Sequence, residues 1–361
     1  MLRWAEIYLG RLLRNYLEIK KLAGTKGIYA VVKANAYGHG SVEVSRALQD
    51  NTDVSGFAVA TYEEAEELRA AGISREILVM ASPLEEGRES VVELKLTPVV
   101  YDEEELRLAK DMGIPFHVKV DTGMGRLGFL QSRWDWLLSE LKDSKVSGVM
   151  THFSSADEDP SFTLEQFRVF KAFVEKLTFL KPELKVHCDN SSALKFKFDS
   201  LLTHSRVGLA LYGASSDFPG SLKQVMEVKA KVISVKELPP GFPVSYSKTY
   251  RTSGRERVAV VAFGYADGLL RSLSNRGYVL IKGRKAPIRG RVCMDMTVVS
   301  VWEGVKKGDV AVISSPDLPF TEIASLAGTI PYELMCDISR RVKRVYVGED
   351  IPAGKEAVGS G

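Results

Sequence analysis

The chain has 361 residues, enough for two domains, and its 45% hydrophobic and 26% charged residues are typical of an ordinary globular protein. Its 49 basic and 46 acidic side chains give a net charge of +3 and are interspersed, which argues against a nucleic acid partner. Charges interrupt every apolar run near the N-terminus and no segment approaches the length of a membrane span, so we expect a cytoplasmic protein with no membrane partner.

Eight short apolar runs in the first part of the chain predict β-strands. They cover residues 28–34, 54–60, 77–81, 97–101, 116–120, 146–151, 185–188 and 206–211. Most are followed by segments with apolar residues at every third or fourth position, which predict helices. This alternation indicates a parallel sheet, and eight βα units fit a (β/α)8 TIM-type barrel better than an open sheet.

Beyond about residue 225 the pattern changes to short alternating runs separated by glycine and proline, as at 258–263, 277–282 and 309–313. We therefore predict a barrel domain over residues 1–225 and a mostly-β domain over residues 226–361. The extreme N-terminus is expected to pack with the second domain.

The three cysteines, Cys188, Cys293 and Cys336, show no Cys-x-x-Cys spacing. They suit a reducing compartment and argue against a zinc site, so no metal is expected. Buried thiols are the default interpretation for all three.

Lys33 ends the first predicted strand and is the most informative residue for function. Burial at a strand end disfavours the ammonium form, so Lys33 is a candidate for a neutral nucleophile that forms a Schiff base with a carbonyl cofactor. The glycine-containing turn over residues 34–40 then leads into a helix whose amides suit a phosphate. Together these features favour pyridoxal phosphate as the cofactor. The ordinary alternative is a solvated lysine before a glycine turn.

Polar residues also gather where other predicted strands end, which is where barrels place their chemistry. They are Asp121 and Arg126 after the fifth strand, His152 at the end of the sixth, Asn190 and Ser191 after the seventh, and Arg206 in the eighth. If Lys33 binds pyridoxal phosphate, the candidate phosphate-binding groups are Tyr37, Asn190-Ser191 and the amides of Gly208 and Leu209. Without Lys33 each of these signals is weak, because Asn190-Ser191 is a very common turn dipeptide and an isolated Tyr37 is more often a packing residue.

The run Tyr-Ala-Val-Val-Lys-Ala-Asn-Ala-Tyr-Gly-His-Gly at 29–40 closely resembles the lysine motif of the fold-type III pyridoxal phosphate enzymes, in particular the alanine racemases. Further motifs at 118–128, 205–213, 262–271 and 291–296 extend the resemblance to about Arg344. It implies a barrel with a C-terminal β domain. It also implies an isomerase that interconverts L- and D-alanine and supplies D-alanine for peptidoglycan.

The resemblance assigns roles to single residues. Racemisation removes a proton from one face of Cα and returns it on the other, so a second base is needed beside Lys33. Tyr265 resembles that base, with Lys33 acting on D-alanine and Tyr265 on L-alanine. His152 and Arg206 would lower the pKa of Tyr265. Arg206 matches the arginine that binds the pyridine nitrogen, and because arginine does not lend a proton, that nitrogen would stay unprotonated.

Three further residues match substrate-binding positions of the family. Arg126 would pair with the substrate carboxylate, and the amide of Met294 would meet the same group. Lys119 matches a lysine that is often carbamylated and orients the arginine. One departure is Arg340, which stands where some members carry a phosphate-binding tyrosine; it either binds phosphate through its charge or the contact is missing.

The close alternative is a broad-specificity amino acid racemase, since sequence does not reveal the pocket volume. A fold-type III decarboxylase is less favoured because the chain is short and would not need Tyr265. A non-catalytic pyridoxal phosphate carrier would lack the β domain. Because Tyr265 and Met294 lie in that domain and Lys33 in the barrel, the resemblance implies a homodimer with shared active sites.

Overall fold

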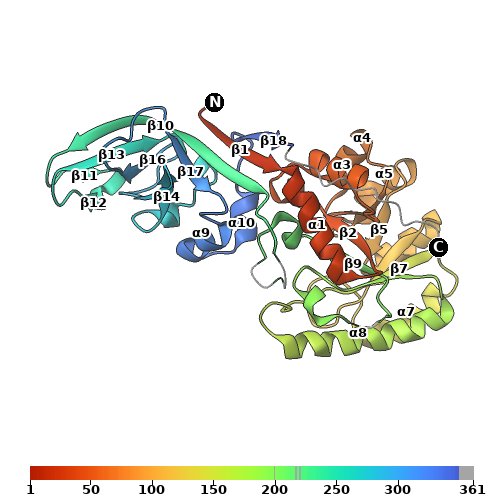
Figure 1. Ribbon diagram of the computed structural model, residues 1–361. Helices are drawn as coiled ribbons and strands as arrows, with labels where there is room; N and C mark the ends of the chain where they lie inside the picture. Colours follow the sequence, from red (N-terminus) through yellow and green to blue (C-terminus); the bar gives the residue numbers. More distant parts are fainter. Residues whose placement is uncertain (199, 216–217, 219–220, 349–361) are drawn as a thin grey trace.

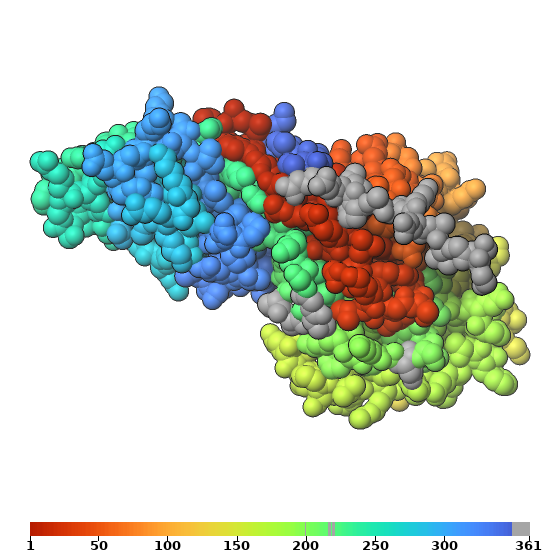
Figure 2. Space-filling model, in the orientation of Figure 1, coloured from red at the N-terminus to blue at the C-terminus, as the bar shows by residue number. Residues whose placement is uncertain are grey.

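The computed structural model describes residues 1–198, 200–215, 218 and 221–348. It has two parts, a parallel barrel and a largely β second part, with the N-terminal strand and helix at their junction (Figure 1). The space-filling view shows the same arrangement, the N-terminal segment in red between the blue second part and the rest of the barrel (Figure 2). None of the helices in the described ranges is both long and apolar enough to cross a membrane.

The predicted (β/α)8 barrel is confirmed. Its strands are β2 Gly27–Val31, β3 Gly56–Val59, β4 Glu76–Val79, β5 Thr97–Val100, β6 Phe116–Lys119, β7 Val146–Met150, β8 Lys185–His187 and β9 His204–Val207. They pair in parallel in the order β8-β7-β6-β5-β4-β3-β2-β9. Backbone bonds across the remaining seam, such as Arg206 N to Asp189 O at 2.9 Å, bring β9 back beside the end of β8.

Helices follow most of these strands and cover the outside of the barrel (Figure 1). They are α1 Leu9–Ala23, α3 Ser41–Asn51, α4 Tyr62–Ala70, α5 Arg88–Glu93, α6 Glu103–Met112, α7 Trp134–Leu141 and α8 Pro160–Leu180. Every residue of β3, β5 and β6 is buried, as expected of parallel strands covered on both faces. Two helices begin at side-chain caps: Asp102 accepts from the amide of Glu105, and Thr61 forms a capping box with Glu64.

The second part is built on β10 Met226–Leu238. The other strands are β13 Glu256–Val261, β14 Tyr278–Ile281, β15 Arg284–Pro287, β16 Thr297–Ser300, β17 Val310–Ser314 and β18 Lys343–Val347, with a small separate pair, β11 Pro243–Val244 and β12 Tyr250–Arg251. The N-terminal strand β1 Arg3–Tyr8 pairs antiparallel with β10 and parallel with β18, so it is part of the second sheet. The domain boundary placed after residue 225 stays a prediction.

Two short helices of the second part, α9 Phe320–Ala327 and α10 Pro331–Cys336, were not predicted. The eighth barrel strand also differs from its prediction at both ends. It begins at His204, and the segment Leu209–Tyr212, predicted largely as strand, is a 3-10 turn. Short apolar segments of this kind carry too few residues to show a helical period.

The first barrel strand ends at Val31. The predicted strand over residues 28–34, with Lys33 at its end, is therefore wrong in its last residues. Lys33 instead opens α2 Lys33–Tyr37, a turn in which Ala34, Asn35, Ala36 and Tyr37 have φ of 51°, 54°, 52° and 51°. Left-handed backbone costs roughly 1–2 kcal/mol for each residue that carries a Cβ, because that atom approaches the following carbonyl oxygen. Four such residues in a row persist only where the surrounding structure fixes them.

One of these fixing groups is His39, which is fully buried just after the turn. Its Nδ1 lies 2.9 Å from the carbonyl oxygens of both Ala36 and Tyr37. Its ring packs on Tyr212 at 4.5 Å between centroids. Because burial lowers the pKa of His39 to about 4, the imidazole is neutral, and an N–H at Nδ1 bonds these carbonyls. His39 is thus a structural support of the turn.

The strained turn gives a stability prediction. Ala34→Gly should raise the free energy of unfolding by up to about 1 kcal/mol, because the relief of roughly 1–2 kcal/mol of left-handed strain exceeds the backbone entropy cost of glycine, about 0.5–1 kcal/mol. Thermal unfolding of the purified variant measures the change. Ala47→Gly, inside the right-handed helix α3, is the matched control and should be destabilising. Equal destabilisation of both variants would contradict the strain.

Candidate active site

Five cationic or titratable side chains predicted for the site gather at the carboxyl ends of the barrel strands. Burial lowers the pKa of His152 to about 3, and the charges that lower it further are, in order, Arg206, Lys119, Arg126 and Lys33. Such mutual effects require the five groups to lie near one another. The structure therefore brings together residues that the sequence spreads over more than 170 positions, and it makes the site strongly cationic.

Lys33 is half-buried within this cluster. Burial lowers its pKa, Arg126 lowers it further, and the carboxylate of Glu64 acts in the opposite direction. A lowered pKa increases the share of neutral amine, which is the nucleophilic form. The environment of Lys33 thus supports the predicted nucleophile, although the lysine lies beyond the strand end.

Arg206 is buried and held by neutral acceptors. Nη1 donates to Nδ1 and to the carbonyl oxygen of His187, both at 2.8 Å, and Nη2 donates to the carbonyl oxygen of Thr151 at 2.7 Å. Burial lowers the pKa of Arg206 to about 10, so it remains a cation at neutral pH and only donates hydrogen bonds. Because Nδ1 of His187 must accept, that imidazole carries its proton on Nε2.

Groups suited to a phosphate meet beside the strained turn. A Cβ at Gly208 would lie only 2.7 Å from the hydroxyl oxygen of Tyr37, so the glycine leaves room beside that hydroxyl. Ser191 Oγ lies 3.2 Å from the amide nitrogens of both Gly208 and Ala210. Because Ser191 Oγ accepts from both amides, its own hydrogen can donate, with the Tyr37 hydroxyl, into the space beside Gly208, which fits a phosphate dianion. These contacts are the structural test of the predicted cofactor, and the residues fit it.

The other predicted phosphate residues have different surroundings. Asn190 Oδ1 accepts from the amide of Ala193 at 2.9 Å, so this side chain closes its own turn. Leu209 begins the 3-10 turn that follows β9. Arg340 is exposed beyond α10. Its contact with phosphate stays a prediction.

Tyr332 was missed by the sequence analysis. It lies on α10, which packs on the strained turn so closely that a Cβ at Gly38 would meet the carbonyl oxygen of Met335 at 2.2 Å. The rings of Tyr332 and Tyr37 are 5.9 Å apart between centroids. Its segment Pro-Tyr-Glu-Leu-Met has no pattern that marks a site, and only the fold reveals this position. Tyr332 therefore packs against Tyr37, one of the phosphate-suited groups.

Cys336, on the same helix, is exposed, so the interpretation of all three cysteines as buried thiols is wrong for this one. Cys188 is buried and Cys293 is half-buried. Cys336 is the last residue of the short helix α10, and no periodicity in the sequence announces its exposure.

The glycine-rich loop after β6 is held by its own carboxylate. Asp121 accepts from the amides of Gly123 and Met124 at 2.8 Å and from that of Arg126 at 3.0 Å. Burial would raise the pKa of Asp121, but these amide bonds outweigh it and lower the pKa. The Arg126 side chain is exposed on this loop, where it is free to meet a ligand.

Lys119 is buried at the end of β6, and burial first and Arg126 second lower its pKa to about 8. The lowered pKa increases the share of neutral amine near neutral pH, and the addition of CO2 requires the neutral form. Its carbamylation stays a prediction, and a mass gain of one CO2 on the peptide that contains Lys119 would reveal it.

Tyr265 and Met294 lie together on a face of the second part. The amide of Tyr265 donates to the carbonyl oxygen of Cys293 at 3.0 Å, and that of Ala266 donates to the carbonyl oxygen of Met294 at 3.0 Å. Their side chains are 44% and 52% exposed. Within the described residues, the hydrogen bonds of Tyr265 stay inside the second part. The structure of one chain thus does not join these two residues to Lys33.

A second tyrosine on this face, Tyr246, was also missed. It is 67% exposed and sits between residues with unusual backbone, since Ser245, Ser247 and Lys248 have φ of 62°, 59° and 52°. Ser245 Oγ donates to the carbonyl oxygen of Arg291 at 2.6 Å, which ties this turn to the loop of Met294. Strained backbone of this kind concentrates at functional sites. The segment Val-Ser-Tyr-Ser-Lys has no sequence signal for it.

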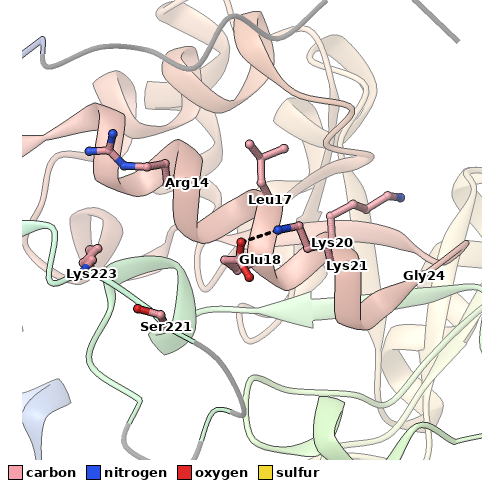
Figure 3. A pocket seen from close by; sticks show the side chains of 8 residues that line it. All are labelled: Arg14, Leu17, Glu18, Lys20, Lys21, Gly24, Ser221 and Lys223. Atoms are coloured by element: carbon pink, nitrogen blue, oxygen red, sulfur yellow. Dashed lines mark hydrogen bonds and ion pairs between the residues drawn. The ribbon is translucent and has the colours of Figure 1, made fainter. Parts of the chain in front are cut away.

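A separate hollow of about 580 Å³ lies outside the barrel along α1 (Figure 3). It is lined by Arg14, Leu17, Glu18, Lys20, Lys21, Gly24, Ser221 and Lys223. Two of its cations are paired, Lys21 with Glu18 at 2.6 Å and Lys20 with Asp53 at 3.1 Å. None of the predicted site residues lines this hollow, so the chemistry belongs to the strand ends.

Comparison with known proteins identifies the family of this chain. A family model described as the alanine racemase N-terminal domain matches residues 7–216, and one described as the alanine racemase C-terminal domain matches residues 225–346. An alanine racemase of Aquifex aeolicus (strain VF5) is 45% identical over 346 residues, which are 95% of this chain and 98% of that protein.

Two solved structures are also similar to the chain. The alanine racemase of the D-cycloserine producer Streptomyces lavendulae has a TM-score of 0.89 at 33% identity, covering 97% of this chain and 98% of that one. The structure from Bartonella henselae, with covalently bound pyridoxal phosphate, has a TM-score of 0.89 at 28% identity and covers 96% of this chain and 100% of that one.

Proposed function

Since this chain belongs to the alanine racemase family, we propose that it interconverts L- and D-alanine with pyridoxal phosphate and so supplies D-alanine for peptidoglycan. The observation that carries the proposal is the half-buried Lys33 among Arg126, Arg206 and Lys119, beside hydroxyl and amide donors for a phosphate. A cationic site of this kind suits both an anionic cofactor and the carboxylate of an amino acid.

The cofactor would be held at three places. Lys33 would bind its aldehyde carbon, Tyr37 with Ser191 and the amides of Gly208 and Leu209 would hold its phosphate, and Arg206 would bind its ring nitrogen. Bound pyridoxal phosphate supplies a carbonyl that captures the substrate amine and an electron sink that acidifies its Cα proton. Tyr332 joins the phosphate-binding group in this proposal because it packs on Tyr37.

The protein's own residues set the outcome of the reaction. Arg206 only donates, so it leaves the ring nitrogen without a proton and favours return of the proton at Cα. Arg126 would orient the substrate through its carboxylate, together with the amide of Met294. Lys33 would move the proton on one face of Cα.

A tyrosine of the second part would move the proton on the opposite face. The resemblance predicts Tyr265, and the structure adds Tyr246 on the same surface. We propose Tyr265 for the proton transfer, because the resemblance gives it that role and the amide bonds of Tyr265 and Ala266 hold it beside Met294, whose amide would meet the substrate carboxylate.

We further propose that the site is shared in a homodimer. Tyr246, Tyr265 and Met294 are large side chains, all exposed on one face. A patch of this kind on a folded chain marks a docking surface. A second copy of the chain fits as its occupant, because the second base and the Met294 amide would then reach a barrel site that lacks both.

The proposal for Lys33 predicts a single labelled residue. Borohydride reduction of the yellow protein should fix the cofactor on Lys33, because that lysine combines a lowered pKa with neighbouring phosphate donors. Peptide mapping by mass spectrometry identifies the labelled peptide. Lys33→Ala should lose the label, whereas label on Lys119 would refute the assignment.

The two tyrosines give opposite expectations for matched variants. The base that serves L-alanine, when replaced by phenylalanine, should spare cofactor binding yet slow Cα exchange from L-alanine by about 10²-fold or more, with a smaller effect on D-alanine. Single-turnover exchange in deuterated water measures both directions. We expect this asymmetry in Tyr265→Phe. Its appearance in Tyr246→Phe alone would give the role to Tyr246, and symmetric losses in both would exclude a tyrosine base.

The shared site predicts complementation. Lys33→Ala subunits are mixed with subunits that lack the second base, Tyr265→Ala or Tyr246→Ala as the exchange assay decides. Random exchange makes about half the dimers mixed, each with one intact site, so activity should recover to about a quarter of wild type. Sites built within one chain would keep one lesion each, and mixing would then restore nothing.

A further inference from the structure

One carboxylate reaches the backbone beside Lys33 from another element. Glu64, near the start of α4, accepts the amide of Ala34 on Oε1 at 2.6 Å and the amide of Ala60 on Oε2 at 2.8 Å. Ala60 follows the neighbouring barrel strand β3, and Ala34 is the first left-handed residue after Lys33. A single side chain thus links two strand ends at the mouth of the barrel.

The Glu64 side chain is itself held in place. It belongs to the capping box of α4, in which the amide of Glu64 donates to Thr61 Oγ1 and the amide of Thr61 donates to the carboxylate. These two bonds only cap the helix. The bond to Ala34 is an addition across 30 positions of sequence, and helix capping does not require it.

The bond falls where the turn most needs support. The first left-handed residue must leave the strand direction, and its amide then points away from any strand partner. A charged acceptor makes a stronger hydrogen bond than a neutral one. At the other end of the turn, Arg344 from β18 donates to the carbonyl oxygen of Gly38 at 2.9 Å, so the turn is held by a charged side chain at each end.

The charge of Glu64 also acts on the Lys33 amine. The titratable and charged groups whose effects reach Lys33 are Arg126 and Arg206, which lower its pKa after burial, and Glu64 and Cys336, which raise it. Lys119 and His152 lie in the same field, since Lys33 lowers the pKa of each. The Glu64 carboxylate thus partly offsets the effect of the neighbouring cations on the pKa of Lys33.

We propose that Glu64 is a positioning residue for Lys33, because its carboxylate fixes the first residue of the left-handed turn and places a negative charge beside the amine. This rests on the proposed function, in which Lys33 binds the cofactor. Glu64 touches neither cofactor nor substrate in this role. It sets where the Lys33 backbone leaves the strand and how readily the amine loses its proton.

The test compares Glu64→Gln with Glu63→Gln, which removes the same charge from the neighbouring, exposed position. The full-length proteins, freed of pyridoxal phosphate with hydroxylamine, are acylated with trace acetic anhydride across a pH series, and peptide mapping gives the titration of Lys33. Removing a nearby negative charge destabilises the ammonium form, so Glu64→Gln should shift the Lys33 titration to lower pH. Glu63→Gln should match wild type.

A purely structural role would not move that titration. If the Lys33 curves of Glu64→Gln and wild type coincide, or if Glu63→Gln shifts equally, the proposal is overturned. Glu64→Ala removes the acceptor as well as the charge, so it should also lower the thermal midpoint more than Glu64→Gln does. Should the alanine variant fail to fold, the glutamine variant still decides.

Failure of the proposed function would look different. In that case borohydride would not label Lys33 in the wild-type protein, whatever the acylation titration shows. If borohydride labels Lys33 but Glu64→Gln leaves its titration unchanged, Lys33 remains the cofactor lysine and only the positioning role of Glu64 is refuted.

Discussion

The left-handed turn after the first barrel strand is the constraint on which the site depends. Were the strand to continue, Lys33 and Tyr37 would stand about 13 Å apart, since an extended chain advances about 3.3 Å per residue. A helical turn of either hand advances only about 1.5 Å per residue, which shortens the separation to about 6 Å along the axis. The turn therefore brings an amine and a hydroxyl within the span of one small cofactor, and the strain of four residues is the cost of doing so.

Charge is the second constraint. Arg206 is buried against two carbonyl oxygens and a neutral imidazole, and none of these cancels its charge. A carboxylate partner would have lowered the cost of burial. A carboxylate partner would also have neutralised the positive charge that attracts an anionic ligand. Holding the guanidinium by dipoles fixes its direction and keeps its charge available. The exposed Arg126 stands on a loop whose amides, its own included, are held by Asp121.

Sequence predicted what periodicity and local chemistry encode. The eight strands were found because each is a short apolar run bounded by polar turns. The strand ends also pointed to Arg126 and Arg206, whose charges act on Lys33 in the structure. The prediction failed where tertiary contacts override local pattern. The strand was expected to include Lys33, but His39, Glu64 and Arg344 together hold a left-handed turn there, and each of these contacts is invisible along the chain. Tyr332 and Tyr246 were missed because the first depends on how α10 packs and the second on backbone strain.

The second part can supply a group on the face of a bound ligand that the barrel strand ends do not reach. Strand ends present their side chains toward one side of a ligand bound across the mouth. Inverting a carbon centre needs a group on the opposite side as well, and that group must come from an element that does not belong to the barrel sheet. In this chain the tyrosines and Met294 lie in the β part, which β1 and β10 join to the barrel, and all three are exposed. Exposed residues that suit such a group, with hydrogen bonds that stay within the second part, are accounted for if the barrel they serve belongs to another copy, as proposed above.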